Sequence, residues 1–150
     1  MLLGLISDTH NLLRPEALSA LKGVDQILHA GDIGAKSILE ALNKIAPTTA
    51  VRGNTDTDPW SKDLPENDMI EAGGAMIYII HDLSKLDLKP EAANIAAVIY
   101  GHSHQPKIEE KKGVLYINPG SAGPRRFNLP ITVGRLKITE GKLKAEILPL

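Results

Sequence analysis

The 150-residue sequence contains no cysteine. Disulfide bonds and thiolate metal ligands are therefore excluded, so any metal ion must be held by imidazole, carboxylate, amide or water ligands. Aromatic residues make up only 3% of the chain, which leaves few side chains on which the bases of a single-stranded nucleic acid could stack. The formal net charge is −1 and no block of like charges occurs, so the charge pattern indicates neither nucleic acid nor an anionic membrane as the main partner.

Long hydrophobic runs are also missing. No apolar stretch approaches the length that spans a membrane. The first residues, MLLGLISDTH, lack a basic leader and reach Asp8 too early for a secretory signal peptide, so we expect a cytoplasmic protein. The length and the hydrophobic content of 43% are typical of one globular domain, which we place at residues 1–150. A homo-oligomer is compatible with these features.

The first third of the chain alternates predicted strands and helices. Three short, mostly apolar runs are typical of buried strands and span residues 2–7, 25–31 and 48–54. Two segments with a helical apolar stripe lie between them, at residues 14–23 and 35–47. This β-α-β-α-β order predicts a parallel sheet with right-handed crossovers.

The second half of the chain is richer in strands. Apolar runs at residues 75–81 and 95–101 predict two further strands, with a short helix between them near residues 90–94. After these, residues 107–118 predict a hairpin, and a last pair of strands is predicted around the turn at residues 139–142. We therefore predict a single α/β domain in which two sheets pack together with helices outside.

Side chains that can bind a metal ion follow five of the predicted strands. They are Asp8 and His10 after the first strand, Asp32 after the second, Asn54 and Asp56 after the third, His81 after the fourth, and His102 and His104 after the fifth. In open α/β sheets, ligands bind at the carboxyl ends of the strands. Each residue alone is compatible with an ordinary turn, but turn chemistry does not explain five such strand ends on one edge. We therefore predict a metal site at this edge.

The fifth histidine, His29, lies inside the predicted strand at residues 25–31. A side chain at such a position projects from a face of the sheet and not from its edge. We assign His29 to packing or to hydrogen bonding that supports the ligands, and not to the metal site itself.

The number of candidate ligands favours two ions. One catalytic ion typically keeps about three protein ligands plus water, whereas seven candidates are available here: Asp8, His10, Asp32, Asn54, His81, His102 and His104. If Asp32 bridges, each ion receives four protein ligands. Two ions about 3.5–4 Å apart suit in-line displacement at phosphorus. A single-ion hydrolase that acts on another class of ester remains the alternative at this point.

Five short motifs carry a resemblance to a known family: Asp8-Thr9-His10, Gly31-Asp32, Gly53-Asn54, His81 and Gly101-His102-Ser103-His104. In these motifs and their order, the chain resembles the calcineurin-like metallophosphoesterases, and in particular their short, single-domain bacterial and archaeal phosphodiesterase branch. The resemblance runs from Leu3 to about Ile138. It implies an α/β fold of four layers, an αββα sandwich of two packed mixed sheets flanked by helices.

The resemblance also implies a dinuclear metal centre. The first ion would be held by Asp8, His10, Asp32 and His104, and the second by the bridging Asp32 with Asn54, His81 and His102. A hydroxide that bridges the ions would attack phosphorus in line, so no protein nucleophile is required. Asp32, Asn54 and His102 are therefore predicted as catalytic residues as well as metal ligands. Manganese is the expected metal, with nickel, iron, zinc and magnesium as alternatives.

Two positions depart from the family pattern. Thr55 stands where many relatives have a histidine that contacts the phosphate or acts as general acid, and Asp82 follows His81 where relatives usually have glycine. A general acid typically contributes about 10²–10⁴-fold to the rate, so its loss predicts a slower or more selective enzyme. We expect the Asp82 side chain to narrow the site or to alter the turn.

Contacts with the substrate are predicted at Asn11, Thr55, Asp56 and Arg125, and Asp56 is also a weaker candidate for the general acid. Asn11 is equally compatible with a turn, whereas for Arg125 a solvated pair with Arg126 is the favoured alternative. The chain has no long insertion from which a deep lid could form. The expected partner is therefore a small phosphoester bound in an open groove.

A binding protein on the same fold is the alternative function. The retromer subunit vacuolar sorting protein 29 resembles these enzymes but acts chiefly as a scaffold with a degraded site. In this chain all seven predicted ligand positions carry metal-competent side chains. The sequence therefore favours a divalent-metal-dependent phosphodiesterase or phosphatase.

Overall fold

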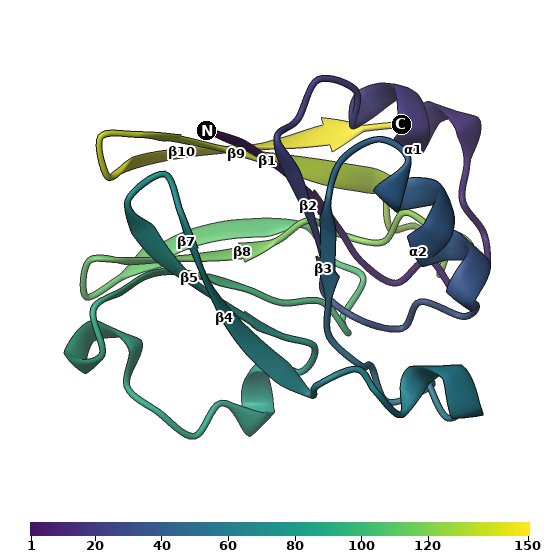
Figure 1. The fold of residues 1–150 in the computed structure, drawn as a ribbon, viewed down its shortest axis with the longest axis horizontal. Coiled ribbons are helices and arrows are strands. Elements are labelled where there is room, and N and C mark those ends of the chain that lie inside the picture. Colours follow the sequence, from purple (N-terminus) through teal and green to yellow (C-terminus); the bar gives the residue numbers. More distant parts are fainter.

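The computed structural model describes residues 1–150 and contains two five-stranded mixed sheets (Figure 1). The first sheet has the order β10-β9-β1-β2-β3, and its strands are β1 (Leu2–Ile6), β2 (Gln26–His29), β3 (Thr48–Ala50), β9 (Thr132–Thr139) and β10 (Lys142–Pro149). The second sheet has the order β4-β5-β6-β8-β7, and its strands are β4 (Asn67–Ala72), β5 (Ala75–Ile80), β6 (Ile95–Ile99), β7 (Lys107–Lys111) and β8 (Val114–Asn118). No helix has the length and apolar character needed to cross a membrane.

The first sheet contains the predicted β-α-β-α-β unit. Strands β1, β2 and β3 are parallel neighbours, linked by the helices α1 (Pro15–Ala20) and α2 (Lys36–Asn43). Leu42 of α2 belongs to a buried cluster with Ile6 and Ile27 of the sheet, because the apolar stripe of the helix faces the strands. Strands β9 and β10 extend the sheet on the other side of β1 in antiparallel pairing.

The largest buried cluster lies between the two sheets. Leu5 and Leu28 of the first sheet meet Ile77, Ile99 and Ile117 of the second, and all five side chains are fully buried. Strand β1 contributes to this cluster on one face and to the helix-facing cluster on the other. Burial of both faces explains why its sequence is a nearly continuous apolar run.

A third apolar cluster covers the outer face of the second sheet. Tyr78, Val98 and Tyr116 form part of it, and partly buried leucines from residues 83–88 pack against it. The covering segment contains only single-turn 3₁₀ helices, η2 (Leu83–Lys85) and η3 (Pro90–Ala92). The predicted four-layer αββα arrangement is therefore confirmed, with the fourth layer made of single-turn 3₁₀ helices. One of these, η3, corresponds to the short helix predicted near residues 90–94.

The sequence pattern does not predict strand β4. Its residues alternate between exposed and partly buried positions, and Asn67, Met69 and Glu71 point outward on this edge strand. Asparagine and acidic residues are depleted in strands, which masks the alternation. The sequence does carry a local signal, the Gly73-Gly74 pair, which is typical of a two-residue hairpin turn. In the structure both glycines have the positive φ that such a turn requires.

We expect Ile99→Ala to lower the free energy of unfolding by about 2–5 kcal/mol, because it removes buried methyl groups and leaves a cavity between the sheets. Ile108→Ala on β7 is the matched control, since that side chain is 41% exposed. The control should change stability by less than about 1 kcal/mol. Urea denaturation measures both, and equal losses would contradict the position of Ile99 in the inter-sheet core.

Candidate metal centre

The carboxyl ends of strands from both sheets meet at one edge of the molecule. In the first sheet, the backbone N–H of Asp8 donates to the carbonyl of Gly31 at 3.0 Å, which continues the β1–β2 pairing into the loops. In the second sheet, Gly101 N–H donates to the His81 carbonyl at 3.0 Å. The His102 N–H then donates to Asp8 Oδ2 at 3.1 Å and joins the two sheets. The structure thus brings the five predicted strand ends together.

One group of ligand atoms is formed by Asp8, His10 and His104. His104 Nε2 lies 3.4 Å from Asp8 Oδ1 and 3.4 Å from His10 Nε2, and His10 Nε2 lies 3.9 Å from the same carboxylate oxygen. Asp8 Oδ1 is buried and has no hydrogen-bond partner. A buried carboxylate oxygen without a partner is costly, and a cation held by these three residues would satisfy it. The residues therefore fit a metal ion.

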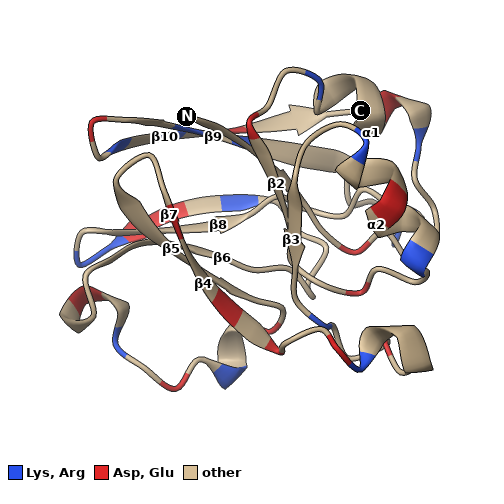
Figure 2. Cartoon of the chain, in the orientation of Figure 1, with Lys and Arg blue, Asp and Glu red and all other residues tan.

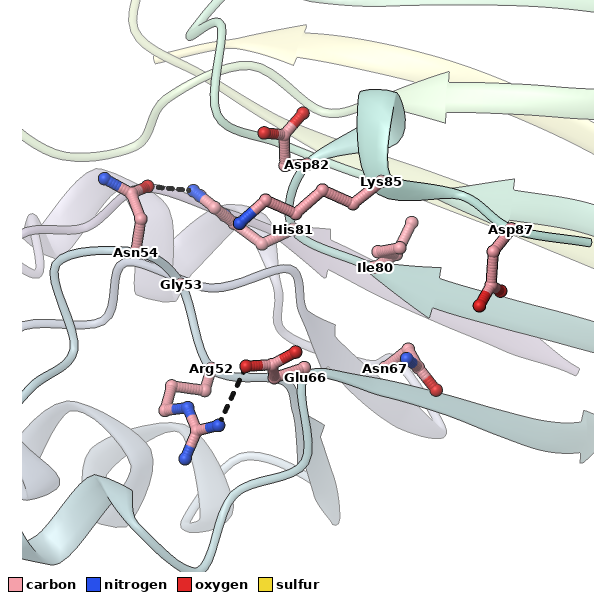
Figure 3. A pocket seen from close by; sticks show the side chains of 10 residues that line it. All are labelled: Arg52, Gly53, Asn54, Glu66, Asn67, Ile80, His81, Asp82, Lys85 and Asp87. Carbon is pink, nitrogen blue, oxygen red and sulfur yellow. Dashed lines mark hydrogen bonds and ion pairs between the residues drawn. The ribbon is translucent and has the colours of Figure 1, made fainter.

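A second group is formed by Asp32, Asn54, His81 and His102. Asn54 Oδ1 lies 3.0 Å from His81 Nε2 and 3.2 Å from His102 Nδ1, and Figure 3 shows the amide of Asn54 facing the ring of His81. His81 Nε2 is also 3.3 Å from Asp32 Oδ2. The same oxygen, Asp32 Oδ2, lies 3.7 Å from His10 Nε2 of the first group. Asp32 therefore faces both groups.

A hydrogen bond to the backbone of Ala30 fixes the orientation of the His81 ring. Its Nδ1–H donates to the carbonyl of Ala30 at 2.7 Å, and this contact directs Nε2 at the other candidate ligands. Asp82, the departure from the family pattern, uses its carboxylate to accept hydrogen bonds from Ser84 N at 3.0 Å and Ser84 Oγ at 2.7 Å. The Asp82 side chain therefore caps the turn at η2, in keeping with the expected effect on the turn.

Most of the ligand residues have an uncommon backbone conformation. Positive φ values occur at Asp8 (55°), His10 (43°), Asp32 (56°), His102 (72°) and His104 (64°). Non-glycine residues in this region cost about 1–3 kcal/mol each and persist where the surrounding structure holds them. The hydrogen bonds between the loops supply that restraint, so the side-chain directions are set by the backbone.

The glycines of two motifs leave space for ligands that belong to other motifs. A side chain at Gly53 would overlap the Asp32 carboxylate, and one at Gly101 would overlap Ser7 Oγ and the Asp8 carboxylate. Ser7 is fully buried and donates to Asp8 Oδ2 at 2.6 Å. This contact positions the Asp8 carboxylate, and the sequence pattern does not predict it. Its signal was modest: a serine that ends an apolar strand directly before the first ligand.

The charges of the site favour ionised carboxylates. Burial opposes ionisation of Asp32, but hydrogen bonds from His81 and from the Thr55 backbone outweigh burial and lower the pKa of this carboxyl. Burial is likewise outweighed at Asp8, where the nearby imidazole of His104 and a hydrogen bond from Ser7 lower the pKa. The pKa of His81 is raised in spite of burial, because Asp32 and Asp8 favour its charged form. Binding of a divalent cation would replace a proton here.

His29 does not belong to either ligand group. It is fully buried, and its Nδ1 accepts from the Gly31 N–H at 3.1 Å. Its Nε2–H consequently donates to Thr9 Oγ1 at 3.0 Å, and that hydroxyl donates to the Ile33 carbonyl at 2.8 Å. Burial lowers the pKa of His29 to about 4. A neutral His29 thus ties together the loops that carry Asp8 and Asp32.

Asp56 differs most from its predicted role. Its buried carboxylate accepts hydrogen bonds from the N–H groups of Gly53 at 2.9 Å, Ile33 at 3.0 Å and Gly34 at 3.2 Å. Both carboxylate oxygens are used in this way, so the geometry gives no support to a substrate contact or a general acid at Asp56. Instead, the hydrogen bonds of Asp56 connect the loop after β3 to the loop after β2.

The other three predicted substrate contacts are exposed. Thr55 lies beside the centre, where its N–H donates to Asp32 Oδ1 at 3.0 Å. The backbone N–H of Asn11 donates to the Ile33 carbonyl at 2.9 Å, and the Asn11 side chain makes no hydrogen bond to the protein. Arg125 donates to the Leu129 carbonyl at 3.3 Å, within its own loop. These three residues remain predictions as substrate contacts.

Comparison with known proteins agrees with this geometry. The sequence profile of the calcineurin-like phosphoesterase superfamily domain matches residues 1–141. A probable metallophosphoesterase of Methanocaldococcus jannaschii is 34% identical over 163 residues, which cover 100% of this chain and 82% of the relative. A solved archaeal phosphodiesterase has a TM-score of 0.82 at 26% identity, with 99% of this chain and 100% of that chain covered. Wild-type Vps29 of Entamoeba histolytica, solved with zinc, has a TM-score of 0.78 at 23% identity, with 99% of each chain covered, which shows the shared fold.

The chain therefore belongs to the calcineurin-like phosphoesterase superfamily. As a member of that superfamily it is a hydrolase, a metal-dependent phosphoesterase. The resemblance inferred from the five motifs and the α/β fold that it implied are both confirmed.

The buried, neutral state of His29 predicts a pH dependence of stability in the metal-free protein. The pKa is about 4 in the folded state against 6.5 for the free side chain. Below pH 6.5 the His29 imidazole binds a proton in the unfolded chain but not in the folded chain. The free energy of unfolding should therefore fall as the pH drops from about 6.5 to about 4, by about 1.4 kcal/mol per pH unit. Urea denaturation with a chelator measures this slope. His29→Gln should flatten it, and an unchanged slope in that variant would refute the assignment.

Proposed function

We propose that this chain is a divalent-metal-dependent phosphodiesterase with a dinuclear centre. The observation that carries the proposal is the position of Asp32: its Oδ2 lies 3.7 Å from His10 Nε2 and 3.3 Å from His81 Nε2. One carboxylate oxygen between two groups of ligands is the arrangement that a bridging ligand requires. The family to which the chain belongs supports the proposal.

The ligand assignment follows from the two groups. The first ion would be held by Asp8, His10, Asp32 and His104, and the second by Asp32, Asn54, His81 and His102. Imidazole, carboxylate and amide donors without thiolate suit manganese, and iron, nickel, zinc and magnesium are alternatives. Two such ions would neutralise the phosphate charge and supply the bridging hydroxide for in-line attack on phosphorus.

The protein groups of the centre are suited to an anionic substrate. Among the proposed ligands only Asp8 and Asp32 carry negative charge, and the amide of Asn54 adds a donor atom without adding charge. Asp8 is fully buried, whereas Asn54 and His102 are exposed. The carboxylates thus lie at the floor of the site, and Asn54 and His102 face the side from which a phosphoester would enter.

The protonation of the leaving group is not assigned to a side chain. Thr55 replaces the histidine of many relatives, and the hydroxyl of threonine is not a general acid near neutral pH. The carboxylate of Asp56 is occupied by three backbone N–H groups. Without a general acid, the enzyme should favour substrates whose leaving group needs no proton, such as aryl phosphodiesters.

A scaffold function on the same fold is less well supported. The structural likeness to Vps29 is at 23% identity and concerns the fold alone. The large exposed apolar side chains come from separate elements; Met69 and Ile108, for example, lie on the two opposite edge strands of the second sheet. The complete set of converging ligands favours the enzyme.

Titration of the metal-free protein with Mn²⁺ should show two ions bound per chain. Asp32→Asn should weaken both sites by more than about tenfold, because Asp32 is the shared ligand, whereas His104→Ala and His81→Ala should each weaken one site. Calorimetry and elemental analysis give the number of ions. Glu16→Gln, in the first turn of α1, is the control and should keep both ions. A single ion per wild-type chain, with no second site at higher Mn²⁺, would overturn the dinuclear centre.

Wild-type protein supplied with Mn²⁺ should hydrolyse bis(p-nitrophenyl) phosphate, and a chelator should abolish the activity. Asp32→Ala and His102→Ala should lower kcat/KM by at least about 10³-fold, because each removes a ligand of the proposed centre. Release of p-nitrophenolate is followed by absorbance, and thermal melting confirms that the variants fold. Full activity in either variant would exclude this site as the catalytic centre.

A further inference from the structure

A second feature lies directly beside the metal centre. A cavity of about 190 Å³, called here the side cavity, is lined by Arg52–Asn54, by Glu66 and Asn67, and by residues from Ile80–Asp87 (Figure 3). Its walls come from the loop after β3, the start of β4 and the segment after β5. Asn54 and His81 belong both to this wall and to the second ligand group. A substrate whose phosphorus lies at the metal centre would therefore direct one substituent into the side cavity.

Lys85 is the one cation of the side cavity that has no ion-pair partner. Arg52, the other cation, lies 3.1 Å from Glu66 in an ion pair. Figure 3 shows the Lys85 side chain directed toward His81 and Asn54. Both signs of charge are otherwise distributed over the sheets and loops of the molecule (Figure 2), so the position of Lys85, rather than a general basic surface, is the distinguishing feature.

The size and the lining of the side cavity define what fits. Its volume is far above the roughly 10–15 Å³ that one water needs and below the roughly 300–1,000 Å³ of sites that enclose drug-sized ligands. Ile80 is its only hydrophobic lining residue. Asn67 and Asp87 lie at the end away from Asn54, as Figure 3 shows, and offer an amide and a carboxylate to hydroxyl groups. The carboxylate of Asp87 at that end disfavours a second anionic group.

We propose that the side cavity binds the alcohol substituent that a phosphodiester retains during hydrolysis, and that this substituent is small, uncharged and hydroxylated. Lys85 contacts an anionic oxygen of the phosphoryl group, and Asn67 and Asp87 bind hydroxyl groups of the substituent. This inference rests on the proposed phosphodiesterase function. It adds the substrate class, and it assigns a binding role to three residues outside the predicted site.

Two synthetic diesters test the proposal: propyl p-nitrophenyl phosphate and 2,3-dihydroxypropyl p-nitrophenyl phosphate, which differ only in two hydroxyl groups. For hydrolysis of either ester, water adds to phosphorus as the bond to p-nitrophenolate breaks, which yields p-nitrophenol and the alkyl phosphate. The 2-hydroxyl of the dihydroxypropyl ester can also expel p-nitrophenolate and form a cyclic phosphate, so the rates with Mn²⁺ alone are subtracted and only the open-chain alkyl phosphate, resolved by ³¹P NMR, is counted. With Mn²⁺, the wild-type kcat/KM should be about tenfold or more higher for the dihydroxypropyl ester, because a site that hydrogen-bonds hydroxyl groups rejects the analogue that lacks them.

The variants separate the two roles. Asp87→Ala should move the ratio of the two kcat/KM values toward one. Lys85→Gln should lower kcat/KM for both esters by about tenfold, mainly through KM, because it removes a charge-assisted contact that both esters share. Lys89→Gln, an exposed lysine outside the side cavity, is the matched control and should behave as wild type.

A binding measurement gives a readout that does not depend on turnover. Calorimetry should show that 2,3-dihydroxypropyl phosphate binds wild-type protein more tightly than propyl phosphate does, and that Asp87→Ala removes the difference. The side-cavity proposal would be overturned by equal kcat/KM values for the two esters together with equal affinities for the two alkyl phosphates. It would also be overturned if Lys85→Gln had the same kcat/KM as Lys89→Gln. Either result would leave the phosphodiesterase function standing. Failure of the wild type to hydrolyse either ester with any divalent metal would overturn both.

Discussion

The burial of two carboxylates, Asp8 and Asp32, at the meeting edge of two packed sheets is the constraint on which the rest of the structure depends. Isolated buried charges are very costly, and they persist only when they are paired or hydrogen-bonded. Here the imidazoles of His81 and His104 and backbone N–H groups from neighbouring loops surround them, and Ser7 adds a short hydrogen bond to Asp8. Asp8 Oδ1 is left without a partner in spite of this shell. The fold has therefore concentrated negative charge where a bound cation stabilises it.

Holding this charge in place requires the loops themselves to be rigid, and two buried side chains achieve this in opposite ways. Asp56 acts only as an acceptor, taking hydrogen bonds from N–H groups in two different loops. His29 stays neutral, accepting from Gly31 and donating to Thr9. Both residues act at a distance from any substrate. Their hydrogen bonds explain how the left-handed backbone of the ligand residues is maintained without regular secondary structure.

The sequence predicted which side chains converge at this edge, but it did not predict the supporting roles of Ser7 and Asp56, for a physical reason. Ligands such as Asp32 and His102 follow apolar strands, so strand periodicity alone places them on one edge. The role of Asp56 depends on which N–H groups surround it, and that is decided by tertiary contacts between loops that no local pattern encodes. Strand β4 was missed because Asn67 and Glu71 on its outward face are residue types that are depleted in strands, although the Gly73–Gly74 turn marked it. Lys85 carried no signal at all, since a lysine in a polar loop is ordinary.

On the proposed mechanism, the threonine at position 55 and the side cavity together suggest where substrate discrimination lies. An enzyme with a histidine at position 55 could act on alcohols that leave poorly, because it would protonate them. With Thr55 at that position, the leaving group must be intrinsically good or be protonated by water. On the proposed mechanism, binding energy is then better used on the substituent that stays on phosphorus, where Lys85 and Asp87 are positioned to act. The selectivity of this chain would therefore depend on the retained alcohol more than on the departing one.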